Sequence, residues 1–214
     1  MRSVRIFYKK KGEIKFISHL DLNRFMIRMV RKSGIPVWYS EGFNPHPYIT
    51  FALPLSLGFE SDYEVMDIRL DDDNFKNSDV LKALSAEMPF GIELFEASNP
   101  IMKSGEVAFA SFDVEFDTEL GKVTDDIISF LSREHIFAEK KTKKGGTKII
   151  DFKEFIKDFK VEGNKLILIL SAGGSNNLNP KLLLDAYNKE SGKKLPPSFI
   201  TRTMLYNSNM ERFA

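Results

Sequence analysis

Cysteine is absent from this chain of 214 residues. Its absence excludes disulfide bonds, thiolate catalysis, and cysteine ligation of zinc or an iron–sulfur cluster by this chain. Histidine is also scarce, because only His19, His46 and His135 occur and no two of them have His-x-x-x-His spacing. We therefore expect neither a metal site nor a cofactor.

Long apolar runs are lacking as well. No stretch approaches the roughly 18 consecutive apolar residues of a membrane span. The first residues, "MRSVRIFYKKKGEIKF", are charged throughout and lack the continuous apolar segment of a secretory signal. Enzyme motifs such as Gly-x-Ser-x-Gly, the phosphate-binding loop and the dinucleotide fingerprint are missing too. We expect a soluble, cytoplasmic protein that does not bind membranes.

The net charge of +1 conceals a strong segregation of charge along the chain. Residues 1–52 carry a net charge of +7, residues 53–126 carry −13, and residues 127–214 carry +7. If the two basic segments converge in space, they form a surface suited to a polyanion. The alternative is that each is simply a solvated face.

The N-terminal segment predicts a strand followed by a helix. Residues 2–9 alternate apolar and polar side chains, which suits a strand near the edge of a sheet. Ser18 and Asp21 have the spacing of a capping box, and Gly34 and Pro36 end the helix that they begin. Cations share its other face and are candidates to bind phosphates: Arg24, Arg28, Arg31 and Lys32.

The order of predicted elements indicates an α+β fold. Strand, helix, strand, strand, helix, strand in residues 1–98 is the ferredoxin-like order. After a polar boundary near Pro100 and Gly105 the order partly recurs in residues 106–214, with a helix over residues 180–191 and a last strand over residues 198–206. We expect two tandem ferredoxin-like halves, the second of them embellished.

The stretch "YSEGFNPHPYITFALPLSLG", residues 39–58, contains more chemistry than a turn needs. Pro45 and Pro47 bracket His46, and their fixed φ angles stiffen the loop around the imidazole. We treat the loop as a candidate recognition loop, although a corner that merely turns the chain is the simpler alternative. Its candidate residues are Ser40, Glu41, Gly42, Phe43, Asn44 and His46.

Two further side chains are candidates from their positions. His19 follows the helix-capping Ser18, where it could contact a phosphate or simply hydrogen-bond a neighbouring loop. Arg202 alternates with apolar neighbours in the last strand, so its cation needs a partner, and we count it among the nucleic-acid-binding candidates.

The motifs "SHLDL" (18–22), "YSEGFNPHP" (39–47) and "PLSLG" (54–58) stand together in an order that resembles the radical S-adenosylmethionine (SAM)-linked protein family. The resemblance implies a domain of unknown function that occurs alone or fused to cobalamin-binding radical SAM enzymes. A chain without cysteine would be a stand-alone version whose enzyme partner is a separate chain. This sequence departs from the family at Tyr48, where a basic residue is usual.

Three functions remain open from the sequence. The leading hypothesis is a non-catalytic accessory module that recognises tRNA or rRNA and presents it to a radical SAM enzyme. The second is a metal-independent endoribonuclease with His19 or His46 as its catalytic base. The third is a protein–protein adaptor that docks a partner through the acidic segment.

Overall fold

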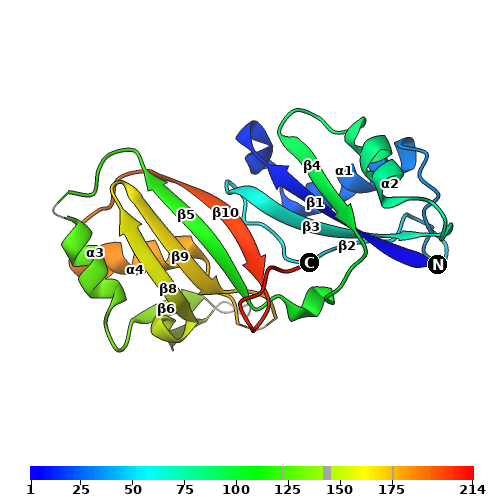
Figure 1. The fold of residues 1–214 in the computed structure, drawn as a ribbon. Helices are drawn as coiled ribbons and strands as arrows, with labels where there is room; N and C mark the ends of the chain where they lie inside the picture. The colour runs from blue at the N-terminus through cyan, green and yellow to red at the C-terminus, as the bar shows by residue number, and fades with distance from the viewer. Residues whose placement is uncertain (122, 142–145, 175) are drawn as a thin grey trace. The chain divides into compact units, whose positions relative to one another are not determined.

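The computed structural model describes residues 1–121, 123–141, 146–174 and 176–214. It is an α+β protein in which the sheets and helices divide between two compact units (Figure 1). The first unit comprises Met1–Val107 together with Arg212–Ala214, and the second comprises Ala108–Glu211. Within the described ranges no helix is both long enough and apolar enough to cross a bilayer.

The first unit contains an antiparallel sheet with the strand order β4-β1-β3-β2. Along the chain its elements are β1 (Arg2–Lys10), η1 (Gly12–Phe16), α1 (His19–Lys32), β2 (Ile49–Phe51), β3 (Glu60–Leu70), α2 (Asn77–Ser85), β4 (Ile92–Ser98) and η2 (Ser104–Glu106). As predicted, β1 lies near an edge of the sheet: β4 is the edge strand, and β1 is the next strand in, paired with β4 on one side and β3 on the other.

Strand β1 lies between β4 and β3, and side chains on both of its faces are buried. Ile6 and Tyr8 point into a core that contains Leu22 of α1 and Leu84 of α2. On the opposite face Arg5 is fully buried. Its guanidinium makes two 2.8 Å hydrogen bonds to the Asp67 carboxylate, donates to the Met102 carbonyl and lies 4.5 Å from the centre of the Phe213 ring. The buried charge is therefore paired and hydrogen-bonded, as burial of a charge requires.

Helix α1 begins and ends where the sequence predicts. The Ser18 hydroxyl accepts a hydrogen bond from the Asp21 amide at 3.2 Å and donates one to the Asp21 carboxylate at 2.7 Å. Gly34 lies in the left-handed region with φ of 71°, just beyond the C-cap. Leu22, Met26 and Val30 face the core, so the arginine-rich side of the helix is left at the surface.

The second unit contains an antiparallel sheet with the strand order β10-β5-β9-β8 and a separate hairpin. Along the chain its elements are β5 (Phe109–Phe116), α3 (Val123–Leu131), β6 (Phe137–Lys141), β7 (Thr147–Asp151), η3 (Phe152–Phe155), β8 (Ile156–Glu162), β9 (Lys165–Ser171), α4 (Pro180–Ser191) and β10 (Ser198–Tyr206). The hairpin of β6 and β7 is inserted between α3 and β8.

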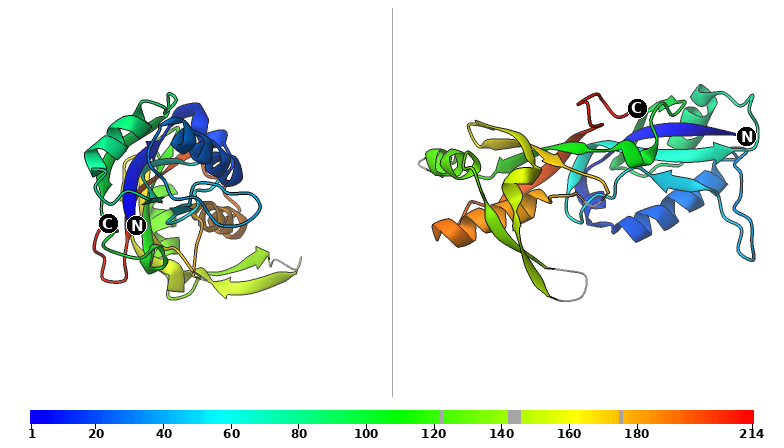
Figure 2. Two further views of the ribbon diagram at one scale, coloured as in Figure 1. Left: turned by 90° about the vertical axis from the view of Figure 1, so that its right-hand side faces the viewer. Right: turned by 90° about the horizontal axis from the view of Figure 1, so that it is seen from below.

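A segment between α1 and β2 projects from the first unit as a narrow loop (Figure 2). It corresponds to the predicted recognition loop. Only Ile49–Phe51 at its exit form a regular strand. We refer to residues 38–48 as the finger.

Candidate nucleic-acid interface

The finger is anchored at its base by backbone hydrogen bonds to β3. The Trp38 amide donates to the Arg69 carbonyl at 2.9 Å, and the Arg69 amide donates to the Tyr48 carbonyl at 3.1 Å. Across the finger, the Tyr48 amide donates to the Trp38 carbonyl at 3.0 Å, and the Ser40 amide donates to the His46 carbonyl at 2.9 Å. The two sides of the finger are thus paired up to Ser40 and His46.

Side chains brace the finger further. The Arg31 guanidinium of α1 donates to the Pro45 carbonyl at 3.0 Å and lies 5.8 Å from the centre of the Tyr39 ring. The Ser40 hydroxyl accepts a hydrogen bond from the His46 amide at 3.2 Å. Together with the fixed φ angle of Pro45, these contacts hold the finger to the C-terminal end of α1.

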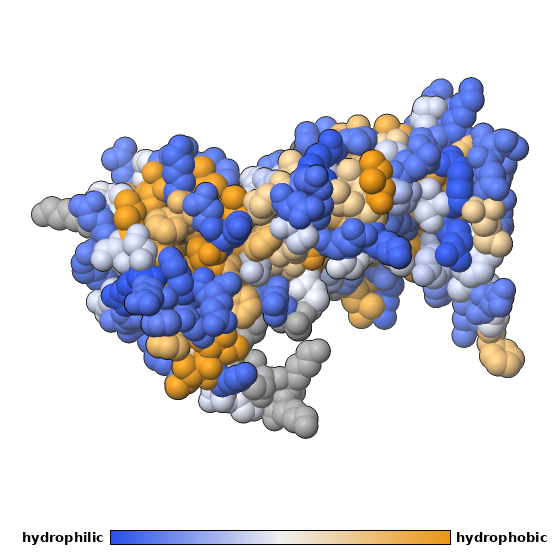
Figure 3. All heavy atoms as spheres, turned by 60° about the horizontal axis from the view of Figure 1, so that its bottom comes forward, coloured by the Kyte–Doolittle hydropathy of each residue, from blue (hydrophilic) through white to orange (hydrophobic). Residues whose placement is uncertain are grey.

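The tip of the finger presents an aromatic ring to solvent. Phe43 is fully exposed, and its neighbours Glu41 and Asn44 are exposed too. Gly42 has φ of 118°, a conformation that L side chains rarely adopt, so the turn that carries Phe43 requires glycine. In the space-filling view the tip of this projection is apolar (Figure 3).

The predicted cationic face of α1 forms a stripe that leads to the finger. At 3.6 residues per turn, Arg24, Arg28 and Arg31 lie within roughly 60° of one another around the helix. Arg24 makes an exposed ion pair with Asp21 at 3.4 Å. Arg28 is exposed and has no hydrogen bond or ion pair with any residue that the structure describes. Lys32 points elsewhere, because it pairs with Glu87 beyond α2.

An arginine–aromatic stack at the base of the finger was missed by sequence reasoning. The Arg69 guanidinium lies 5.1 Å from the Trp38 ring centre and 4.8 Å from the Tyr48 ring centre. The only sequence signal was a cation alternating with apolar residues in β3. The stack also concerns Tyr48, which stands where the family that the sequence resembles usually has a basic residue. In this protein Arg69 places a cation against the Tyr48 ring.

The two candidate catalytic histidines lie at opposite ends of α1. His19 begins the helix, and its ring makes an edge contact with Phe51 at 5.1 Å. His46 lies beside Pro45, whose carbonyl accepts a hydrogen bond from Arg31. Arg31 follows His19 by twelve residues, which corresponds to about 18 Å along the helix axis at 1.5 Å per residue. The structure therefore does not bring the two imidazoles to one site.

One ring nitrogen of His46 faces a backbone carbonyl. Its Nδ1 lies 3.2 Å from the Pro47 carbonyl oxygen. A carbonyl oxygen only accepts hydrogen bonds, so this contact suits a ring with a proton on Nδ1 and directs Nε2 away from the Pro47 carbonyl.

Arg202 differs from the other candidate cations because only 1% of it is exposed. A buried guanidinium does not reach a phosphate on the surface, so we do not retain Arg202 among the phosphate contacts. The alternation of charged and apolar residues in the last strand indicated that the Arg202 side chain projects from one face of the sheet. It could not show whether other parts of the protein pack over that face.

His135, which the sequence left without a function, makes an ion pair in the second unit. Its Nδ1 lies 2.7 Å from the Asp151 carboxylate, and its ring stacks on Phe137 at 5.4 Å. The hydrogen bond to Asp151 raises the pKa of His135. Burial raises the pKa of Asp151, but hydrogen bonds from the Ile136 amide, His135 and the Lys153 amide outweigh it, so the pKa is lowered overall.

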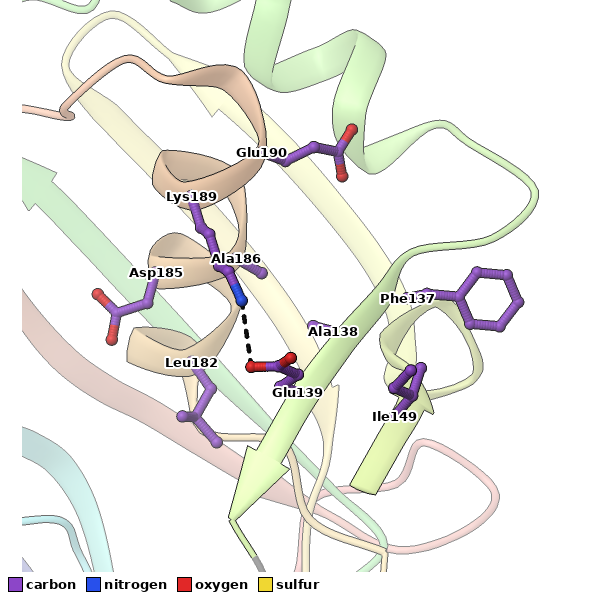
Figure 4. A pocket seen from close by; sticks show the side chains of 9 residues that line it. All are labelled: Phe137, Ala138, Glu139, Ile149, Leu182, Asp185, Ala186, Lys189 and Glu190. Carbon is purple, nitrogen blue, oxygen red and sulfur yellow. Dashed lines mark hydrogen bonds and ion pairs between the residues drawn. The ribbon is translucent and has the colours of Figure 1, made fainter. Parts of the chain in front are cut away.

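A groove of about 470 Å³ lies between the β6–β7 hairpin and α4 (Figure 4). Ala138, Ala186 and Leu182 supply apolar surface, and an ion pair of 3.1 Å between Lys189 and Glu139 crosses it. The acids Asp185 and Glu190 also line the groove, and Glu190 pairs with Arg133. Among the lining residues that the structure describes there is no serine, threonine or histidine that could form a nucleophile–base pair. The groove has the size of a small-molecule site but offers less recognisable chemistry than the finger.

Comparison with known proteins identifies a family. Residues 3–180 match the family described as an uncharacterized protein conserved in bacteria, DUF2344, and the chain belongs to it. The matched region includes α1 and the finger, and the description names neither a reaction nor a radical SAM partner. No curated protein matches the chain.

Among the solved structures that match, one illustrates how distant the similarity is. It is a crystal structure described as a candidate glycine cleavage system transcriptional repressor, with 12% sequence identity to this chain. The alignment covers 93% of this chain and 95% of that one, with a TM-score of 0.28. Similarity at this level carries no conclusion about fold or function.

Proposed function

We propose that this protein is a non-catalytic RNA-recognition module that presents tRNA or rRNA to a radical SAM enzyme on a separate chain. One observation carries the proposal: the exposed arginine stripe of α1 ends at Arg31, which holds the stiff finger. Cations aligned beside exposed polar and aromatic groups suit a ligand that combines phosphates with bases.

The residues divide between two tasks in this proposal. Arg24 and Arg28 bind phosphates, which positions the RNA without reading its sequence. Glu41, Asn44 and His46 are exposed on the finger and offer acceptors and donors to base edges or to a 2′-hydroxyl. Arg31 contributes chiefly by holding the finger, because its guanidinium already donates to Pro45.

The proposal extends to the fold, in which each unit is of the ferredoxin-like type. The chain order β-α-β-β-α-β and the spatial order β4-β1-β3-β2 in the first unit support this assignment. The order β10-β5-β9-β8 supports it in the second unit, where the β6–β7 hairpin is the embellishment.

The enzyme partner rests on the family resemblance and on composition. A chain without cysteine supplies no thiolate for an iron–sulfur cluster, so a cysteine-ligated cluster would have to be held by another protein. The proposal therefore assigns RNA binding to this chain and the radical reaction to its partner.

A second candidate, a metal-independent ribonuclease, is favoured by the exposed position of His46, whose Nδ1 faces the Pro47 carbonyl. Its Nε2 could accept a proton from a ribose 2′-hydroxyl, and Arg31 could stabilise the resulting phosphorane. Because His19 and His46 lie apart, the ribonuclease would use His46 alone as its general base, and its general acid is unassigned.

The test is retention of total small RNA by the purified protein at low and moderate salt, followed by inspection of the recovered RNA. The wild type is compared with Arg24→Ala/Arg28→Ala. A matched control, Lys76→Ala/Lys82→Ala, removes the same charge from exposed positions on and just before α2 in the same unit. We expect salt-sensitive retention of intact RNA that is lost only in the arginine variant.

Other outcomes contradict the proposal in distinct ways. Equal loss in both variants would indicate nonspecific attraction to net charge. Cleavage that disappears in His46→Ala would establish the ribonuclease instead. No retention at low salt by the wild type would favour an adaptor that uses the acidic segment.

A further inference from the structure

The position of Phe43 is costly unless something covers it. A phenylalanine left in water forgoes the favourable free energy that burial of its side chain would provide. The finger is not a loose loop that happens to expose a ring, because its sides are paired and Arg31, Ser40 and Pro45 restrain it. The turn at Gly42 directs the ring away from the first unit rather than into its core.

We propose, resting on the proposed function, that Phe43 stacks on an unpaired base, so that the protein selects single-stranded or loop segments of RNA over duplex. The neighbouring charges favour this occupant over an apolar pocket of another protein. The arginine stripe attracts phosphates, and an aromatic ring beside cations is the arrangement with which proteins bind single-stranded nucleic acid.

The acid next to the ring supports base recognition specifically. Glu41 carries a negative charge that repels phosphate, so the tip itself is poorly suited to the RNA backbone. A carboxylate does accept hydrogen bonds from the amino group of cytosine, and the Asn44 amide matches the edge of adenine. The geometry thus separates a phosphate-binding stripe on α1 from a base-binding tip on the finger.

The test compares the binding of three fluorescently labelled RNAs: an unstructured 12-mer, the same 12-mer annealed to its complement, and a hairpin with an unpaired loop. Removal of one stacking contact lowers affinity for an unpaired strand by about 5- to 150-fold. We expect Phe43→Ala to lower the affinity by this factor for the 12-mer and the hairpin loop but not for the duplex. Phe43→Trp should bind with an affinity close to that of the wild type, and the fluorescence of its introduced indole should be quenched when RNA binds.

Phe90→Ala is the matched control, because Phe90 is 98% exposed in the same unit but lies in the turn before β4. We expect this variant to bind all three RNAs like the wild type. Since Phe43 is fully exposed, its replacement leaves the thermal unfolding of the protein unchanged, which checks that the variant is folded.

The outcomes separate this inference from the proposed function. If Arg24→Ala/Arg28→Ala loses binding while Phe43→Ala binds every RNA normally, base stacking is overturned and RNA binding stands. If the wild type binds none of the three RNAs, both are overturned. A preference of the wild type for duplex would also contradict the stacking role.

Discussion

Arg31 connects the two parts of the candidate interface through a single side chain. Its guanidinium reaches from the last turn of α1 to the Pro45 carbonyl and passes over the Tyr39 ring. A hydrogen bond from a charged donor contributes roughly 1.5–3 kcal/mol, and less when it is exposed as here. The orientation of the finger therefore depends on the hydrogen bond and the ring contact that Arg31 makes, and not only on the positive charge of Arg31.

Replacement of Arg31 should loosen the finger without unfolding the first unit. In Arg31→Ala we expect the Ser40 amide, which donates to the His46 carbonyl, to exchange with solvent several-fold faster. Hydrogen exchange followed by NMR measures this rate. Arg28→Ala, which removes a neighbouring cation of the same face, should leave the rate unchanged, and equal protection in both variants would contradict the bracing role.

The ion pair of His135 with Asp151 makes a contribution to stability that depends on pH. Because its hydrogen bond to Asp151 raises the pKa of His135 above the ordinary value of 6.5, protons bind more tightly to the folded state. The contribution is complete below about pH 6.5 and is lost as pH rises through the folded-state pKa. It weakens again in acid, when Asp151, whose pKa is lowered, becomes protonated.

We therefore expect His135→Gln to lower the melting temperature most near pH 5–6 and little at pH 8.5. Melting curves of both proteins across this range check the prediction. A difference between them that stays constant with pH would show that the imidazole acts through packing on Phe137 rather than through its charge.

Among single residues, the exposed arginines were predictable and their partners were not. Helical spacing places Arg24, Arg28 and Arg31 on one face, since that spacing is a local property of the chain. That Arg31 would meet the carbonyl of Pro45 depends on how the finger folds back, which no local pattern encodes. The burial of Arg202 likewise depends on tertiary packing.

Helix α1 depends on the cap at Ser18. Loss of an N-cap hydroxyl costs about 1 kcal/mol, with a range of roughly 0.5–2 kcal/mol. We expect Ser18→Ala to lower the free energy of unfolding by this amount in urea denaturation and Ser18→Thr to retain most of it. If Ser18→Ala is as stable as the wild type but binds RNA weakly, Ser18 belongs to the ligand site instead.

At the scale of elements, local signals placed some boundaries closely. Pro180 begins α4, where the Asn179 side chain accepts a hydrogen bond from the Lys181 amide, and Gly192 with φ of 66° ends it. Such punctuation can be read directly from sequence. The strand β2 begins only at Ile49, because the Tyr48 amide before it donates to the Trp38 carbonyl across the finger.

At the scale of the whole molecule, the return of the C-terminal residues to the first unit had no sequence signal. Arg212 donates to the Tyr63 hydroxyl at 2.8 Å, and that hydroxyl donates to the Phe213 carbonyl at 2.7 Å. Contacts across about 150 residues leave no periodicity in either segment. Element order along the chain could be predicted, but which distant segments meet could not.

Charge segregation gives the central claim its most direct test. Residues 1–52, which contain α1 and the whole finger, have a net charge of +7, and Arg24 and Arg28 are the exposed phosphate candidates of this segment. Each phosphate contact with a single strand contributes about 0.7 to the slope of log affinity against log salt concentration. The two arginines together should therefore account for a slope of about 1.4.

The measurement is a salt titration of binding to the labelled 12-mer RNA. We predict that Arg24→Ala/Arg28→Ala reduces the slope by about 1.4, while Lys76→Ala/Lys82→Ala leaves it unchanged. An identical slope for the wild type and the arginine variant would contradict the assignment of the α1 stripe as an RNA-binding surface.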